Sequence, residues 1–218
     1  MSPAEPDATA GKVPWTGKII ALQPRIRLMR SYDQRNHAYQ GYALRLLGRV
    51  DGTEREFTVG IGKAAQAKHA FHVGDEVAGA AVPVADSQSE PVEFYYKVSA
   101  LKLVYRAVQA VPAPPPWVGV PPALEVYRAR GHRRLDVATY EASCLSCLWG
   151  CRMPVEISVD HWNPKEKQHR DETFCYGPKS CPTYRAGATR KVPGRGGSVW
   201  EEDDAVDEEA TGHRGLDD

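Results

Sequence analysis

The chain has 218 residues, of which 42% are hydrophobic and 26% charged, an ordinary composition for a globular protein that buries a core. No apolar run approaches the roughly 20 residues that span a bilayer, and the N-terminus lacks the basic start and apolar stretch of a signal peptide. We therefore expect a cytoplasmic protein with no membrane partner. Seventeen prolines and nineteen glycines favour short strands and turns over long helices.

The formal net charge of zero hides an uneven distribution. Residues 201–218 hold nine acidic residues and one arginine, which leaves 27 basic and 19 acidic residues in 1–200, a net charge of +8. A basic body indicates an anionic partner, which an acidic tail could mimic, and the tail could also contact protein partners. The composition of residues 191–218 predicts a disordered acidic tail, whose simplest role would be to keep the protein soluble.

Along the chain, residues 1–14 are polar and predict disorder. From Thr16 onward the apolar residues alternate with polar ones, which is typical of strands, and Asp51-Gly52 is a hairpin turn signal. An alanine-rich segment favours a short helix. The predicted elements are strands at 17–30, 40–50 and 54–61, a helix at 63–70, and strands at 73–83 and 94–105.

This order of three strands, one helix and two strands resembles the OB-fold, a five-stranded Greek-key barrel with its helix between the third and fourth strands. Residues 74–77, Gly-Asp-Glu-Val, resemble the entry to the fourth strand of many such barrels. The resemblance covers residues 16–106 only. It implies a barrel fold, and OB barrels bind oligonucleotides among other ligands.

The remaining chain divides by composition. Prolines concentrated in residues 107–122 predict a semi-rigid linker. Residues 123–190 begin with a basic connector and continue into a cysteine-rich module. We therefore predict a mainly β protein: a five-stranded OB-like barrel with one helix, plus a small irregular metal-bound module.

The five cysteines all lie in the last third of the chain, at Cys144, Cys147, Cys151, Cys175 and Cys181. A Cys-x2-Cys turn places two thiolates on one knuckle, and a second pair can complete a tetrahedral shell. The pairs Cys144/Cys147 and Cys175/Cys181 are similar to a zinc ribbon, although five residues separate the second pair instead of two. A reducing compartment and an odd number of cysteines favour metal over disulfides.

Three readings of this cluster stay open. Four thiolates would hold a structural Zn²⁺, and Cys151 would then be spared. An iron–sulfur cluster would require Cys151, because Cys-x2-Cys-x3-Cys followed by a distant Cys-Pro is similar to ferredoxin ligation. The cysteines could also be buried small hydrophobes without metal. His161 and His169 lie between the pairs and could replace one cysteine.

Arginines and tyrosines interleave over residues 25–39. A single-strand binding groove needs this combination, because guanidinium groups pair with phosphates while flat rings stack on bases. Alternatively, these side chains form a strand face that contacts solvent and binds no ligand. The predicted nucleic-acid contacts are Arg25, Arg27, Arg30, Tyr32, Arg35, Tyr39, Arg45, Lys97, Arg133 and Arg134.

No motif indicates catalysis, since the sequence offers neither a Gly-x-Ser-x-Gly elbow nor a zinc-deaminase pattern. We therefore predict a non-enzymatic protein that binds single-stranded DNA or RNA and contains a structural metal site. One alternative is an iron–sulfur protein for electron transfer or redox sensing. Another is an interaction scaffold or acyl-ligand binder, because OB barrels joined to zinc ribbons also resemble thioester-binding proteins.

Overall fold

The structure, a computed structural model, describes residues 11–32, 34–96, 100–108, 114–160, 162–163 and 167–218. Most of the predicted disordered segment 1–14, part of the predicted linker, Lys97 and His161 lie outside these residues. No helix in the described ranges is long and apolar enough to cross a membrane.

The N-terminal half folds as the predicted barrel. Its strands close in the order β1-β2-β3-β5-β4, with β4 returning to pair with β1 and β5 running parallel to β3. Helix α1 (Lys63–His69) lies between β3 and β4 along the chain, as in an OB barrel. A mainly β fold with a closed five-strand barrel is thus confirmed for the described chain. The barrel strands are β1 (Val13–Ser31), β2 (Arg35–Val50), β3 (Thr53–Ile61), β4 (Glu76–Pro83) and β5 (Phe94–Tyr95).

Alternation of side chains builds the barrel core as expected from the sequence. Leu44 and Leu46 of β2 are fully buried, whereas the intervening Arg45 faces outward. The hairpin between β2 and β3 turns at Asp51 and Gly52, whose φ angles of 48° and 79° are both positive, as a tight two-residue hairpin turn requires.

The predicted last barrel strand, 94–105, is not one element. It is divided into β5 and β6 (Lys102–Tyr105), and both pieces pair antiparallel with β4 along the edge opposite β1. Residues 97–99 between them lie outside the described ranges.

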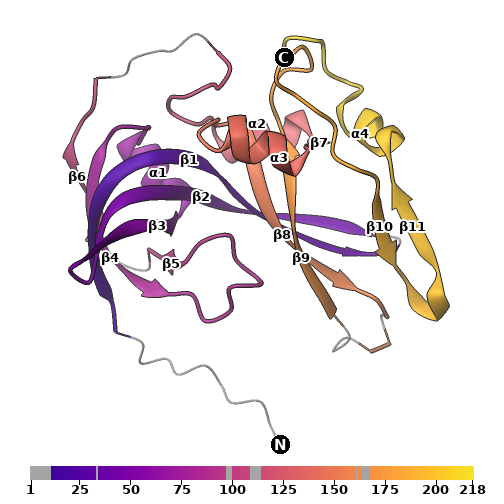
Figure 1. Cartoon of the computed structure of the whole chain (residues 1–218), viewed down its shortest axis with the longest axis horizontal. Coiled ribbons are helices and arrows are strands. Elements are labelled where there is room, and N and C mark those ends of the chain that lie inside the picture. The colour runs from indigo at the N-terminus through magenta and orange to yellow at the C-terminus, as the bar shows by residue number, and fades with distance from the viewer. Residues whose placement is uncertain (1–10, 33, 97–99, 109–113, 161, 164–166) are drawn as a thin grey trace, which may run out of the picture.

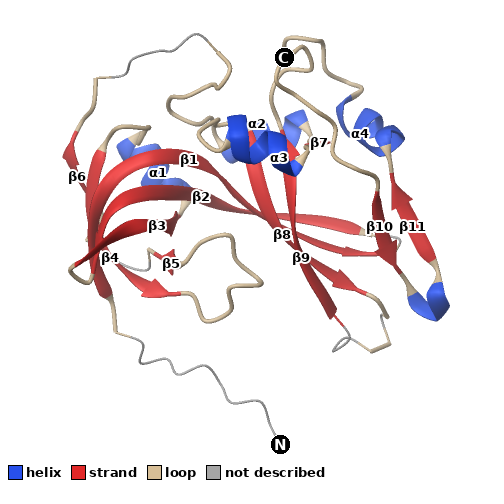
Figure 2. Cartoon of the chain, viewed as in Figure 1, coloured by secondary structure: helices blue, strands red, loops and turns tan. Residues whose placement is uncertain are grey.

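The cysteine-rich segment continues the barrel sheet. The last residues of β1, Leu28–Ser31, pair in parallel with β8 (Gly150–Ser158), and β8 forms a hairpin with β9 (Lys167–Cys175). The short β7 (Arg133–Arg134) adds to β9. One sheet of nine strands therefore runs through the described chain, and Figures 1 and 2 show β1 extending from the barrel to β8 and β9.

This arrangement differs from the small irregular module expected from the sequence. Met153, Val155 and Ile157 alternate along β8 and are buried, so one face of the hairpin joins the same hydrophobic core as the barrel. The other described elements are helices α2 (Leu124–Arg130), α3 (Val137–Thr139) and α4 (Asp204–Thr211), the π-helical turn Tyr140–Cys144, the 3₁₀ turn Arg195–Gly197, and strands β10 (Arg190–Pro193) and β11 (Val199–Glu202).

The acidic C-terminal segment is folded, so the prediction of a disordered tail over 191–218 is wrong. Strand β11 pairs with β10, and the Asp203 side chain caps helix α4 by accepting a hydrogen bond from the Ala205 N–H at 3.0 Å. Composition did not reveal this because the partners of the acidic residues lie far away in the sequence.

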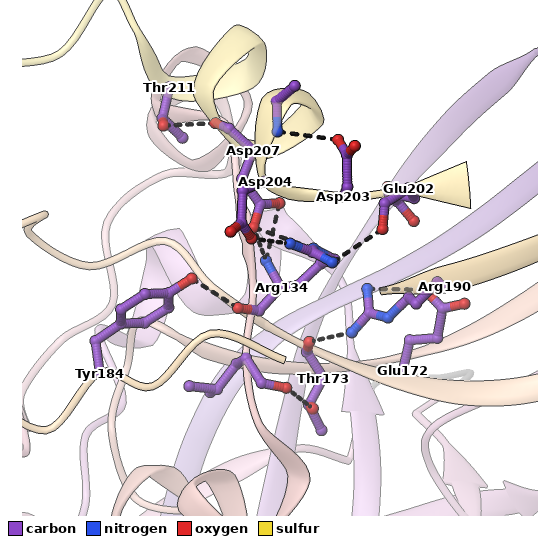
Figure 3. Close-up of polar contacts among 12 residues, drawn as sticks. Arg134, Glu172, Thr173, Tyr184, Arg190, Glu202, Asp203, Asp204, Asp207 and Thr211 are labelled. Atoms are coloured by element: carbon purple, nitrogen blue, oxygen red, sulfur yellow. Dashed lines mark hydrogen bonds and ion pairs between the residues drawn. The ribbon is translucent and has the colours of Figure 1, made fainter. Parts of the chain in front are cut away.

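Two acidic residues of this segment are buried against arginines. The Glu202 side chain is 1% exposed, and its carboxylate accepts a hydrogen bond from the Arg30 guanidinium at 2.8 Å. The Asp207 carboxylate accepts the Arg134 backbone N–H at 3.1 Å and also pairs with the Arg134 guanidinium, which further contacts Asp204 (Figure 3). These ion pairs tie the C-terminal segment to β1 and β7.

Replacing Glu202 tests how far these ion pairs stabilise the fold. Glu202→Ala leaves the buried Arg30 with Glu172 alone, at 3.5 Å, so the loss should approach but stay below the ~3–5 kcal/mol that a fully unpaired buried charge costs. The matched control is Glu201→Ala, because Glu201 is an exposed neighbour that pairs with exposed Lys191 and should contribute at most about 1 kcal/mol. Urea unfolding of both variants measures the difference, and equal losses would contradict the structural role of Glu202.

Candidate metal centre and ligand groove

Four of the five cysteines gather at one place. Cys144 closes the π-helical turn Tyr140–Cys144, Cys147 lies in the next turn, Cys175 ends β9, and Cys181 lies in a turn beyond it. All four line one cavity of about 10 Å³, close to the smallest volume that holds a single water molecule.

Apolar side chains enclose this cavity. Trp117, Trp149 and Tyr184 pack against the cysteines together with buried Leu135. Such a shell limits the access of water, which strengthens the interaction between a metal ion and its ligands.

Hydrogen-bond donors point at the sulfur atoms. The Gly177 backbone N–H donates to the Cys175 sulfur at 3.3 Å, and backbone hydrogen bonds from Trp149 and Trp117 act on the Cys147 thiol. Donors around a sulfur atom favour its thiolate form, which is the form that binds metals.

Burial opposes the ionisation of three of these thiols. Burial raises the pKa of Cys144 to about 12 and that of Cys147 to about 11, and burial also raises the pKa of Cys175. Within the described ranges, no group of three or more His, Cys, Asp or Glu side chains has a geometry ready to hold a metal ion. The four cysteines of the described chain thus line one cavity but do not, as placed, form a set of metal ligands.

Cys151 is separated from the other four. It is fully buried in the barrel core between β1 and β8, where its thiol donates to the Pro24 carbonyl at 3.4 Å. His169 is also engaged elsewhere, since its ring lies 3.8 Å from the Glu156 carboxylate.

A groove lies beside the cysteines, on the outer face of the barrel. Two adjoining cavities of about 260 and 530 Å³ share Ala21, Arg45, Glu56 and Leu145 among their lining residues. One wall is the outer face of β1, β2 and β3, and the other comes from the segment that precedes and includes the first cysteine pair. The groove is lined by Ile20, Ala21, Gln23, Pro24, Ala43, Arg45, Glu56, Thr58, Pro91, Pro115, Pro116, Tyr140, Glu141, Ala142, Ser143, Leu145, Ser146, Arg152 and Thr183.

Charges in the groove occur in exposed pairs. The Arg45 guanidinium contacts the Glu56 carboxylate, and the Arg152 guanidinium lies 3.1 Å from Glu141. Ion pairs of this kind contribute little to stability and are readily exchanged for other partners.

Most of the predicted nucleic-acid contacts are used inside the protein. Arg30 and Arg134 are buried in the ion pairs with the C-terminal segment, and Arg35 shares Glu202 at 3.4 Å. Arg133 is buried, lies over the Tyr184 ring at 3.8 Å and donates to the Pro178 carbonyl at 2.9 Å.

The other predicted contacts do not form one surface either. Arg25 lies over the Tyr95 ring at 5.1 Å, Arg27 pairs with Glu156, and Arg128 covers the half-buried Tyr39 ring at 4.8 Å. Tyr32 is 44% exposed but lies away from the groove residues, in a separate cavity. Of the ten predicted residues, Arg45 alone lines the groove, and Lys97 lies outside the described residues.

Several groove residues carry no sequence signal of their own. Gln23 and Tyr140 belong to no recognisable motif and lie 117 positions apart in the sequence, so only the fold brings them together. Arg152 was recognisable in principle, because it follows Cys151 in a strand whose alternation turns it outward.

Comparisons of the chain with protein-family models, curated proteins and solved structures find no match. The likeness to OB barrels therefore rests on strand order and helix position alone.

Proposed function

We propose that the protein is a non-enzymatic single-strand nucleic-acid-binding protein whose groove is built on a structural zinc site. The observation that carries the proposal is the convergence of Cys144, Cys147, Cys175 and Cys181 on one small cavity next to an open groove on the ligand-binding face of an OB-like barrel.

The donor set fits Zn²⁺. Four cysteines from two segments separated by 27 residues supply four soft ligands, the number that a structural zinc site takes. The backbone N–H groups aimed at Cys147 and Cys175 would offset the negative charge of the four thiolates. Bound metal would supply the attraction between the cysteines, and the thiols would lose their protons on binding.

The metal proposal predicts different outcomes for different cysteines. Cys144→Ser or Cys175→Ser should reduce the bound metal from about one ion per chain to near zero and destabilise the cysteine-rich segment, because metal binding contributes folding energy. The matched control is Cys151→Ala, which should keep the metal. Elemental analysis of the purified proteins and thermal unfolding measure both effects.

Retention of metal and fold by a Cys144→Ser, Cys175→Ser double variant would contradict the proposal. Brown protein with visible charge-transfer absorption would instead identify the iron–sulfur alternative.

The groove suits an extended single strand. Its prolines, alanines and Leu145 offer apolar contacts to bases without reading their edges, and Arg45 and Arg152 offer two cations to phosphates. A phosphate would compete with Glu56 and Glu141 for these guanidinium groups, at a modest cost because both ion pairs are exposed.

Salt dependence tests the strand-binding proposal. Fluorescence anisotropy of labelled oligothymidine at about 50–200 mM salt should show affinity falling with salt, and Arg45→Ala with Arg152→Ala should lower the slope by roughly one per lost phosphate contact. The matched control is Arg49→Ala, an exposed arginine of the same strand that lies outside the groove.

The control variant should bind as the wild type does. Absence of binding at low salt would favour the scaffold or acyl-ligand alternative, and an affinity independent of salt would contradict phosphate contacts.

A further inference from the structure

The metal centre and the groove share one segment of chain. Within residues 140–147, Cys144 and Cys147 supply half of the four-cysteine cluster, while Tyr140, Ser143 and Leu145 line the groove. Any shift of the Cys144–Cys147 turn, called the knuckle below, therefore moves one wall of the groove.

Gln23 joins this wall to the barrel. Its side-chain nitrogen donates to the Cys144 carbonyl at 2.9 Å and to the Cys147 carbonyl at 3.0 Å. Its side-chain oxygen accepts the Tyr140 hydroxyl at 2.7 Å. Both polar atoms of the Gln23 side chain, which is 8% exposed, are thus hydrogen-bonded to the segment that carries the knuckle.

The Gln23 side chain is also confined by its surroundings. A Cβ atom on Gly150 would lie 2.8 Å from the Gln23 nitrogen and 2.7 Å from the Cys144 carbonyl oxygen, so only glycine fits at that position. Gln23 itself lines the groove. It therefore contacts the knuckle on one side and the space for a ligand on the other.

We propose that Gln23 is a positioning residue that couples the metal centre to the groove, so that metal and strand each strengthen the binding of the other. This inference rests on the proposed function. Metal held by Cys144 and Cys147 orders the carbonyls to which Gln23 donates, and Gln23 holds Tyr140 and the groove wall against the barrel. Because coupling between two sites is reciprocal, a strand that orders the wall tightens the metal by the same factor.

The first test needs no nucleic acid. Competition between the protein and a chromophoric chelator gives the Zn²⁺ affinity of the full chain and of two variants. Gln23→Met keeps a side chain of similar length but removes both hydrogen bonds to the Cys144 and Cys147 carbonyls. It should lower the Zn²⁺ affinity about 10- to 100-fold, the usual effect of losing a group that orients a ligand. Tyr140→Phe keeps both of these hydrogen bonds and should lower the Zn²⁺ affinity less than Gln23→Met does. Equal Zn²⁺ affinity in Gln23→Met and wild type would overturn the proposal.

The second test measures the coupling. In the wild type, saturating oligothymidine should raise the Zn²⁺ affinity measured with the chelator, and in Gln23→Met the ratio of the Zn²⁺ affinities with and without oligothymidine should fall toward one. A merely structural role for Gln23 would lower stability without changing this ratio. An identical ratio in both proteins would also overturn the proposal.

The two proposals fail in distinguishable ways. If the zinc-loaded wild type binds no oligothymidine, strand binding fails, whereas the Zn²⁺ affinities still decide the role of Gln23. If the wild type binds no Zn²⁺, both the metal site and the coupling are wrong.

Discussion

Strand β1 is the constraint on which the rest of the structure depends. Its 19 residues pair with β2 and β4 inside the barrel and with β8 outside it, so a single strand belongs to both halves of the molecule. Gln23 lies in its middle, under the cysteine knuckle, and Arg30 lies near its end, against Glu202. The barrel and the cysteine-rich segment therefore cannot move independently, which allows a metal in one half to influence a groove formed by both.

The acidic C-terminal segment changes how the basic residues are understood. Arg30 and Arg134, which the sequence predicted to contact phosphates, instead pair with Glu202 and Asp207. Because these ion pairs are buried, they hold the fold together and do not face a ligand. Removing the segment would leave Arg134 without its carboxylate partners and Arg30 with Glu172 alone, instead of freeing either arginine for nucleic acid. The cations that remain available to a ligand at the groove are Arg45 and Arg152, each held by an exposed carboxylate.

The barrel could be predicted because the sequence patterns that specify it involve residues close together in the chain. Alternation along β2 and the Asp51-Gly52 turn determine strands and register within a few residues. The gathering of two cysteine pairs was also predictable from their spacing. The position of Cys151 was not, since it depends on β8 joining β1, a parallel pairing between strands far apart in the sequence. The same distance hid the ion pair between Arg30 and Glu202, as no local pattern links residues 172 positions apart.

The central claim is that four cysteines form one metal centre, and X-ray absorption at the metal edge tests it most directly. For the full chain purified with its metal, the account predicts zinc with four sulfur neighbours at about 2.3 Å. A protein without metal, or a shell in which nitrogen or oxygen atoms replace the sulfurs, would contradict it.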